Sequence, residues 1–569
     1  MREPAAVRPR KVRLGDLLLE HKVISQSQLD AALADQRKSG RRLGRVLIEN
    51  GFLTEDQLLD FLSRQLDIPF VDLRHYTFQP EVVRLIPEAH ARRFRAIALA
   101  CEDQAVLVGF ADPIDLFAYD EISRLVQRPL RPAVVKETDL LKAIDVVYRR
   151  TEEISGLAAE LEQELAAYDV DLGLGAAEAA TDAPVVKLLQ TVFEDAVQVH
   201  ASDIHIEPDE RALRIRFRID GELRVQTVAD RRIAQALVSR LKLMTGLDIS
   251  EKRLPQDGRC QVRVRDAQID VRLSTLPVQH GESVAMRLLN QSTGILALDR
   301  LGMPQPLLQG LRAMIQKPHG MVLVTGPTGS GKTTTLYAML AQLNDPSRKL
   351  LTVEDPVEYR LEGVNQVQVN PKIDLTFARV LRAFLRQDPD VVLVGEMRDA
   401  ETVEIGLRAA MTGHLVLSTL HTHDAVSSAL RLMDMGAEPY LVAASLRGVL
   451  AQRLVRRVCD SCAEDVPATP SETALLRGAL GGDAPFVLRR GRGCAFCHHT
   501  GFRGRIGVYE LLEIDEPLTL ALQSGKPDVF VKEANAQPSY HRLKVEALAQ
   551  VARGNTTLDE ALRAVYGTG

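Results

Sequence analysis

The sequence predicts an α/β protein built around a mostly parallel sheet with helices on both faces. Three observations predict this fold. Short apolar runs alternate with helical segments from Gly320 to about Arg456, the order expected of a doubly covered parallel sheet. A glycine-rich turn directly follows the first run. The chain is also 569 residues long, which implies additional domains before and after this sheet.

Composition narrows the classes of partner. Hydrophobic residues make up 46% and charged residues 26% of the chain, with a net charge of −5. These values are typical of globular domains with sizeable cores. A protein that holds nucleic acid or an anionic membrane usually carries a basic excess, so neither partner is expected. No run reaches the roughly 20 apolar residues of a membrane-spanning helix, and we expect a cytoplasmic chain.

An internal repeat occupies residues 1–66, the first predicted domain. Arg13, Leu14 and Gly15 are followed 29 positions later by Arg42, Leu43 and Gly44. Apolar residues recur at intervals of three and four residues, so each copy predicts a short helix, a turn and a longer helix. Ser25 and Thr54 stand where caps would begin the longer helices.

The segments before the predicted parallel sheet differ in composition. Residues 67–150 mix strand-like and helical runs and predict a small α/β domain. Residues 151–183 contain no Lys or Arg, which favours an acidic linker, helical at most in its first half. A helical pattern followed by alternating strands over 184–300 predicts an α+β domain. The sheet itself is placed at 301–458.

The glycine-rich turn fits a phosphate-binding loop. The pattern G-x-x-x-x-G-K-[ST] is matched by Gly326, Pro327, Thr328, Gly329, Ser330, Gly331, Lys332 and Thr333, with Thr334 next. Backbone N–H groups of such a loop converge on phosphates at a helix N-terminus. Lys332 would reach the β/γ-phosphates of ATP, and the Thr333 hydroxyl would bind Mg²⁺.

Carboxylates end two further apolar runs. Glu396 follows Asp390–Gly395 in the layout of an acid that acts on Mg²⁺ or its water. Glu354, Asp355 and Glu358 follow Leu351–Val353, where one acid could orient or deprotonate water. A solvated acidic turn is the alternative.

Two histidines flank the apolar run 415–420. His414 or His421 could sense a γ-phosphate by hydrogen bonding, whereas His423 has the pattern of a structural residue. A structural role is also the usual one for a single histidine.

Four of the six cysteines form two CxxC pairs. Cys459 and Cys462 are separated by 31 residues from Cys494 and Cys497. In a cytosolic chain this pattern indicates metal before disulfide, and four thiolates suit a closed, structural Zn²⁺ site. We expect a zinc-binding insertion at 459–500 and a helical C-terminal part at 501–569.

Together these motifs resemble the ATPases of type II secretion and type IV pilus assembly. The resemblance runs from about Pro184 onward and includes the segments 200–208, 216–221 and 251–259. It implies a RecA-like P-loop core, a preceding PAS-like α+β domain that closes on nucleotide, and a homohexamer. It also makes Glu358 the catalytic acid and residues 412–422 the histidine segment. Arginine fingers would fall on Arg216 or Arg218 and on Arg382 or Arg386.

Segments 395–399 and 432–440 look closest to the ATPase of mannose-sensitive haemagglutinin pili. This resemblance implies pilus assembly against an inner-membrane platform protein, and a peripheral position at that membrane. Both repeat copies resemble a tandem motif that binds cyclic di-GMP, through Arg13, Leu14 and Gly15 and their counterparts. The first copy departs from the motif because Lys22 stands where the second has Gly51. A helical docking domain for a membrane partner is the alternative.

Other classes of function remain open from the sequence. A general type II secretion motor is the nearest alternative. A nucleic-acid translocase would also need a P-loop ring, although the net charge disfavours it. A scaffold that binds ATP without turnover is disfavoured by the presence of Lys332, Glu358 and Glu396.

Overall fold

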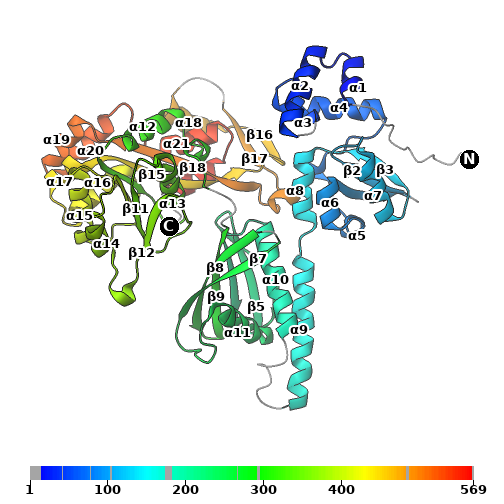
Figure 1. Ribbon diagram of the computed structural model, residues 1–569, viewed down its shortest axis with the longest axis horizontal. Helices are drawn as coiled ribbons and strands as arrows, with labels where there is room; N and C mark the ends of the chain where they lie inside the picture. Colours follow the sequence, from blue (N-terminus) through cyan, green and yellow to red (C-terminus); the bar gives the residue numbers. More distant parts are fainter. Residues whose placement is uncertain are drawn as a thin grey trace, which may run out of the picture.

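The computed structural model describes residues 14–40, 43–76, 78–102, 105–172, 182–265, 267–290, 295–481 and 486–566. In Figure 1 the N-terminal helices and the small α/β domain lie on one side of the molecule and the P-loop domain on the other. The α+β domain lies between them, beside the long helix α9.

Two helix pairs form the N-terminal repeat. The helices are α1 (Leu14–Glu20), α2 (Gln26–Ser39), α3 (Leu43–Glu49) and α4 (Glu55–Leu66). Ser25 and Thr54 cap the longer helices, and each forms a reciprocal pair of hydrogen bonds with the glutamine three residues on. The predicted caps are therefore confirmed. Lys22 and Gly51 both have positive φ, 56° and 71°, so the two copies share one turn conformation despite the different residue.

The small α/β domain has a three-stranded sheet of order β1-β2-β3. Strands β1 and β2 are antiparallel, and β2 and β3 are parallel. Its elements are η1 (Leu73–His75), α5 (Pro80–Val83), α6 (Glu88–Phe94), β1 (Ala96–Glu102), β2 (Ala105–Phe110), α7 (Leu116–Val126), β3 (Leu130–Val134) and α8 (Glu137–Val147).

The segment expected to be an acidic linker is largely a packed helix. Helix α9 (Thr151–Leu172) buries Ile154, Leu157, Leu161 and Leu165 against the core of the α+β domain. Its apolar residues recur at intervals of three and four residues and form a stripe along one face of the helix. Burial of this stripe stabilises the helix even though the exposed face is acidic. Residues 151–172 therefore belong to the α+β domain. Residues 173–181 lie outside the described chain.

An antiparallel six-stranded sheet completes the α+β domain, in the order β6-β5-β4-β9-β8-β7. Helices α9, α10 and α11 pack with this sheet around one apolar core. Its elements are α10 (Asp182–Gln198), β4 (Asp203–Pro208), β5 (Ala212–Ile219), β6 (Glu222–Asp230), η3 (Arg231–Ile233), α11 (Ala234–Thr245), β7 (Gln256–Val264), β8 (Ala267–Val278) and β9 (Gly281–Asn290).

The P-loop domain contains a seven-stranded sheet of order β12-β11-β13-β14-β10-β15-β18. All strand pairs are parallel except β15 with β18, which confirms the α/β prediction. The strands are β10 (Gly320–Thr325), β11 (Leu350–Glu354), β12 (Val364–Gln368), β13 (Val391–Val394), β14 (Leu415–Leu420), β15 (Leu446–Val458) and β18 (Phe502–Glu513). The helical elements are η5 (Leu298–Leu301), α12 (Gln305–Ile315), α13 (Lys332–Leu343), η6 (Pro371–Ile373), α14 (Phe377–Phe384), α15 (Ala400–Met411), α16 (Ala425–Asp434) and α17 (Pro439–Ser445).

The C-terminal part is not purely helical, in contrast to the prediction for 501–569. Strand β18 pairs along β15 and closes the edge of the sheet. Val508 and Leu512 on this strand are fully buried, and the buried Glu510 between them accepts hydrogen bonds from the backbone N–H groups of Ala425 and Leu543. The helices that follow are α19 (Glu516–Gln523), α20 (Pro527–Ala536), α21 (Leu543–Ala552) and α22 (Leu558–Tyr566).

The two cysteine pairs bracket a small hairpin and a helix. This segment contains β16 (Ala463–Pro467), α18 (Pro470–Leu480), β17 (Val487–Gly491) and η7 (Ala495–Cys497). Phe496 and the four cysteines join the apolar core of the small α/β domain. The cysteine segment therefore links that domain to the P-loop domain.

Candidate functional site: the P-loop and its surroundings

The glycine-rich loop connects β10 to α13 as the sequence predicts. Every residue of β10 is buried, and Gly326, Gly329 and Gly331 have φ of 148°, 78° and 88°. A Cβ atom at Gly326 would lie 2.5 Å from the carbonyl oxygen of Gln452. Glycine is therefore required there by conformation and by space.

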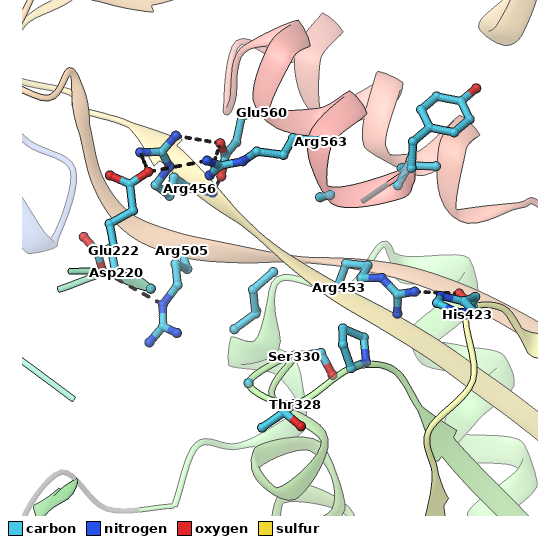
Figure 2. A pocket seen from close by; sticks show the side chains of 17 residues that line it. Asp220, Glu222, Thr328, Ser330, His423, Arg453, Arg456, Arg505, Glu560 and Arg563 are labelled. Atoms are coloured by element: carbon cyan, nitrogen blue, oxygen red, sulfur yellow. Dashed lines mark hydrogen bonds and ion pairs between the residues drawn. The ribbon is translucent and has the colours of Figure 1, made fainter. Parts of the chain in front are cut away.

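A cavity of about 540 Å³ opens at this loop, lined by Pro327, Thr328, Gly329 and Ser330 (Figure 2). Its size is within the range of small-molecule sites. Thr333 and Thr334 are exposed in the first turn of α13, where a hydroxyl can reach a metal ion bound to phosphates. Backbone N–H groups at the start of α13 favour an anion.

The Lys332 ammonium group is held inside the loop. Its Nζ donates to the carbonyl oxygens of Gly326 at 2.7 Å and Pro327 at 3.1 Å. Burial lowers the pKa of Lys332 to about 8, partly offset by the negative charge of Glu396. A phosphate would replace the two carbonyl contacts with a charge-assisted one.

Glu354 ends β11 and is almost fully buried. It accepts hydrogen bonds from Tyr337 Oη at 2.5 Å, Thr352 Oγ1 at 2.6 Å and Gln366 Nε2 at 3.2 Å. Burial and the Glu354 charge raise the pKa of Tyr337, so the phenol stays protonated as a donor. Tyr337 belongs to α13, and this contact fixes the acidic segment to the P-loop helix.

Glu358 faces the α+β domain. Its carboxylate lies 2.9 Å from Arg272 Nη2 on β8, and its backbone N–H donates to Tyr337 Oη at 3.3 Å. Arg272 and Glu358 line a separate cavity of about 260 Å³. The structure therefore joins Glu358 to α13 through Tyr337, but the cavity at the P-loop does not include it.

Glu396 and His421 lie together at the carboxyl edge of the sheet. His421 Nε2 is 3.4 Å from a Glu396 carboxylate oxygen. Glu396 is also paired with Arg398, whose pKa this contact raises. Electrostatic attraction between Glu396 and Lys332 places this pair near the loop.

The other two histidines lie in different surroundings. His414 Nδ1 is 2.9 Å from the carbonyl oxygen of Ala409, which ties the end of α15 to β14. His423, predicted to be the structural member, lines the P-loop cavity. Its carbonyl oxygen accepts from Arg453 Nη2 at 2.9 Å (Figure 2).

Several residues of this site were missed by sequence reasoning. Gln452 on β15 donates to the Ser330 carbonyl at 2.7 Å and accepts from Thr335 at 2.8 Å. Arg453 and Tyr566 line the cavity. The motif gives no sign of them, because they come from β15, which pairs with β10, and from the end of α22.

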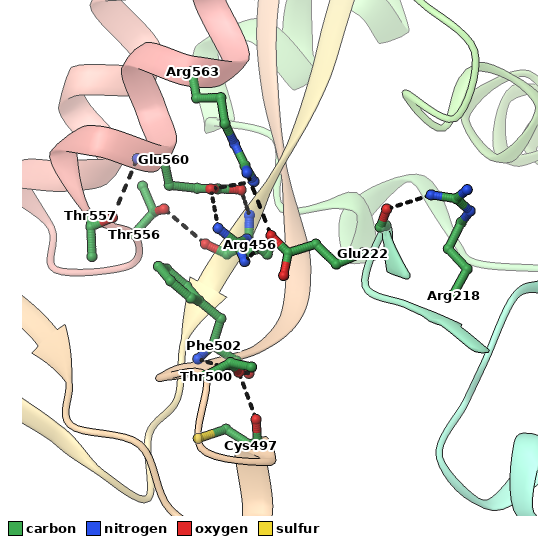
Figure 3. A network of polar contacts seen from close by, with 11 residues as sticks. Arg218, Glu222, Arg456, Cys497, Thr500, Phe502, Thr556, Thr557, Glu560 and Arg563 are labelled. Carbon is green, nitrogen blue, oxygen red and sulfur yellow. Dashed lines mark hydrogen bonds and ion pairs between the residues drawn. The ribbon is translucent and has the colours of Figure 1, made fainter. Parts of the chain in front are cut away.

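An ion-pair network joins the α+β domain to the C-terminal helix beside the cavity. Arg456 on β15 pairs with Glu222 on β6 and with Glu560 on α22, the latter at 2.8 Å (Figure 3). Arg563 lies 2.7 Å from Glu560 and 3.5 Å from Glu222. The two domains therefore meet at the nucleotide loop in this conformation.

The predicted arginine fingers are engaged elsewhere in this chain. Arg216 pairs with Glu207 at 2.6 Å, and Arg218 Nη1 donates to the Gly221 carbonyl at 2.9 Å. Arg382 pairs with Glu401, and Arg386 donates to the Arg382 carbonyl. None of the four lines the P-loop cavity.

The four cysteines form one buried cluster. Cys459, Cys462, Cys494 and Cys497 place their Sγ atoms within 4.8 Å of one another. Three Sγ–Sγ distances are 3.8–3.9 Å, close to the ~3.8 Å edge of a tetrahedron with Zn–S bonds of about 2.3 Å. They are far longer than the ~2.05 Å of a disulfide bond. The cluster therefore fits a zinc ion.

His498 follows the last cysteine and is turned into the protein. Burial, and then the charges of Arg149, Arg224 and Arg503, lower its pKa to about 4. The imidazole is neutral at pH 7, and the cluster has four sulfur ligands without it.

The structure describes the leucines and glycines of the repeat motif, including Gly15 and Gly44. A Cβ atom at Gly15 would lie 2.8 Å from Leu29 Cδ1, and one at Gly44 would lie 3.1 Å from Leu58 Cδ2. Leu14 and Leu43 pack against the core of the repeat. Close packing against the leucines therefore explains why glycine stands at both positions. Arg13 and Arg42 lie outside the described residues.

The fold and this site define a P-loop ATPase with an α+β domain against its nucleotide loop. The profile of the family described as "Type II/IV secretion system protein" matches residues 178–563, and the chain belongs to this family. The MshEN domain matches residues 66–154, that is, the small α/β domain and not the repeat before it. The predicted superfamily, with its MshE-type N-terminal domain, is confirmed.

Relatives cover nearly the whole chain. It is 40% identical over 560 residues to "Type IV pilus assembly ATPase PilB" of Myxococcus xanthus, covering 97% of this chain and 98% of the relative. It is 44% identical over 489 residues to "Type II secretion system protein E" of Pseudomonas aeruginosa, covering 84% and 96%. The chain is an ATPase of this family, and ATP with Mg²⁺ is its substrate.

A solved structure supports the fold alone. The ATPase DotB of Legionella pneumophila is 21% identical, with a TM-score of 0.51, and the match covers 67% of this chain and 96% of DotB. Within the described residues, no helix has the length and apolar character needed to cross a bilayer.

Proposed function

We propose that this chain is the motor for assembly of a type IV pilus, acting as a homohexamer on an inner-membrane platform protein. The P-loop cavity, closed on one side by the α+β domain, carries this proposal. The network of Glu222, Arg456 and Glu560 gives nucleotide a direct way to change the angle between the domains, because it borders the same cavity. A rigid-body rotation can convert each ATP cycle into movement.

Coverage favours pilus assembly over general secretion. The pilus-assembly relative spans 97% of this chain, whereas the secretion relative spans 84%. The mannose-sensitive haemagglutinin type of pilus is our more specific proposal, supported by the MshEN match. The chain would then act in the cytoplasm, at the inner membrane.

In catalysis, Lys332 would hold the β/γ-phosphates and Thr333 the magnesium ion. Glu358 would activate water, while Glu396 and His421 would orient the metal-bound water and sense the γ-phosphate. Glu354 would fix the acidic segment through Tyr337. Because Arg216, Arg218, Arg382 and Arg386 are engaged away from the cavity, we expect any arginine finger to come from a neighbouring subunit.

Complementation tests the assignment to pili. A strain lacking this chain should lose surface filaments, and wild type but not Lys332→Ala should restore them, as counted by electron microscopy. Secretion of folded proteins is measured in the same strains. Loss of secretion with normal filaments would replace this proposal with the type II secretion motor.

We also propose that cyclic di-GMP binds the N-terminal repeat. Arg13 and Arg42 would pair with its phosphates or stack on guanine. Titration of the full chain should give micromolar or tighter binding, weakened about tenfold or more by Arg42→Ala. Equal binding by wild type and by a double Arg13→Ala, Arg42→Ala variant would leave the repeat as a docking domain.

A further inference from the structure

A further cavity, of about 300 Å³, lies where three parts of the chain meet. Asp145 and Val146 come from the end of α8, and Gln198 and Arg224 come from the α+β domain. His498 and Arg503 come from the cysteine segment and the start of β18. No P-loop residue lines this cavity, and it is separate from the repeat.

Two arginines of this cavity each have a buried guanidinium nitrogen without a partner in the described part of the chain. The Nη1 atoms of Arg224 and Arg503 are buried, and neither donates a hydrogen bond to any of the described residues. A buried donor without an acceptor costs about 1–3 kcal/mol, and more when charged. Such groups in a cavity require either an acceptor that enters it or a compensating charge nearby.

The carboxylates that line the cavity are engaged by other groups. Asp145 pairs with Arg92 at 2.6 Å. Asp220 accepts from the Gly504 N–H at 2.8 Å and lies 3.9 Å from Arg505 Nε, which offsets its charge. Nearby Arg149 is itself matched by Asp195, at 3.1 Å. The two guanidinium groups of Arg224 and Arg503 therefore leave this cavity with an excess of positive charge.

We propose that this junction is a binding site for a small phosphate-bearing anion, held by Arg224 and Arg503. Planar guanidinium groups suit phosphate oxygens because they donate in pairs. The volume admits inorganic phosphate or the phosphate of a mononucleotide. Because its walls come from three domains, a bound anion would stabilise their mutual packing, and so couple the N-terminal domain to the P-loop domain.

The cysteine cluster offers another explanation for the two arginines. Four thiolates around a zinc ion carry a net charge of −2, and Cys497 also lines the cavity. Arg224 and Arg503 could offset that charge without any ligand. The two explanations differ in what the arginines support: phosphate binding or retention of the metal.

The test is calorimetric titration of inorganic phosphate into the full chain. Its P-loop is saturated beforehand with a non-hydrolysable ATP analogue and Mg²⁺. Wild type should bind one phosphate per chain. Arg224→Gln and Arg503→Gln should each weaken binding about tenfold or more, with unchanged zinc content.

Arg224→Lys should retain more affinity than Arg224→Gln, and exposed Arg211→Gln should match wild type. AMP titrated in the same way shows whether a mononucleotide binds more tightly than free phosphate.

Three results would overturn the proposal. The first is an absence of phosphate binding by the saturated wild-type chain. The second is binding that Arg224→Gln and Arg503→Gln leave unchanged, or that Arg211→Gln weakens equally, which would indicate non-specific association. The third is loss of zinc from the arginine variants while phosphate affinity stays the same.

Discussion

At the scale of single residues, the pKa of Lys332 gives ATP binding a definite pH dependence. Burial lowers this pKa from its ordinary 10.5 to about 8, so the nucleotide-free ammonium loses its proton as pH rises through 8. A bound triphosphate favours the charged form and raises the pKa again. ATP binding should therefore take up a proton above pH 8, and the affinity should fall by up to about tenfold per pH unit.

Calorimetry in buffers of different ionisation enthalpy measures this uptake, at pH 7 and pH 9. Lys332→Arg serves as the control, since a guanidinium group keeps its charge throughout this range. Equal affinities at the two pH values in wild type would show that Lys332 stays charged before nucleotide arrives.

The limits of sequence reasoning are clearest at single residues. The phosphate loop could be predicted because its function is encoded in consecutive residues, from Gly326 to Thr333. Gln452 and Arg453 could not, because they reach the loop only through pairing of β15 with β10. The Glu358–Arg272 contact likewise depends on how two domains pack, which no local pattern records.

At the scale of elements, amphipathic periodicity was a better guide than composition. The caps of α2 and α4 followed from local hydrogen-bonding chemistry, and the structure has both. Helix α9 was expected to be largely a linker, because its charge was given more weight than the spacing of Ile154, Leu157 and Leu161. Strand β18 was missed because its partner β15 lies more than forty residues earlier.

The cysteine cluster allows a prediction at this scale. Cys462→Ser and Cys497→Ser should each reduce bound zinc from about one per chain to near zero, since a structural site needs all four ligands. Thermal unfolding should begin at a lower temperature, because metal binding contributes to the folding free energy. Zinc is measured by elemental analysis of purified protein.

Cys101→Ser is the matched control, because Cys101 is exposed and outside the cluster. If the cluster variants keep zinc at the wild-type ratio, the metal is bound elsewhere. If wild type contains none, the four buried thiols have a packing role alone.

At the scale of the whole molecule, contacts between side chains of different domains connect the nucleotide site to the rest of the chain. Arg272 holds Glu358 from the α+β domain, the Arg456 network borders the nucleotide cavity, and the cysteine segment packs on the small α/β domain. Changes at the nucleotide can therefore reach the N-terminal domain through residues in direct contact. The fold class could be predicted from the sequence, but these interfaces could not, because no local pattern records how domains pack.

We propose that ATP is cleaved at this P-loop with Glu358 as the acid that activates water. The most direct measurement is single-turnover phosphate release by Glu358→Gln, with ATP binding measured separately on the same protein. We expect ATP affinity within about threefold of wild type and a cleavage rate lowered about 10²- to 10⁴-fold, the usual contribution of a general base. Cleavage at the wild-type rate would contradict it.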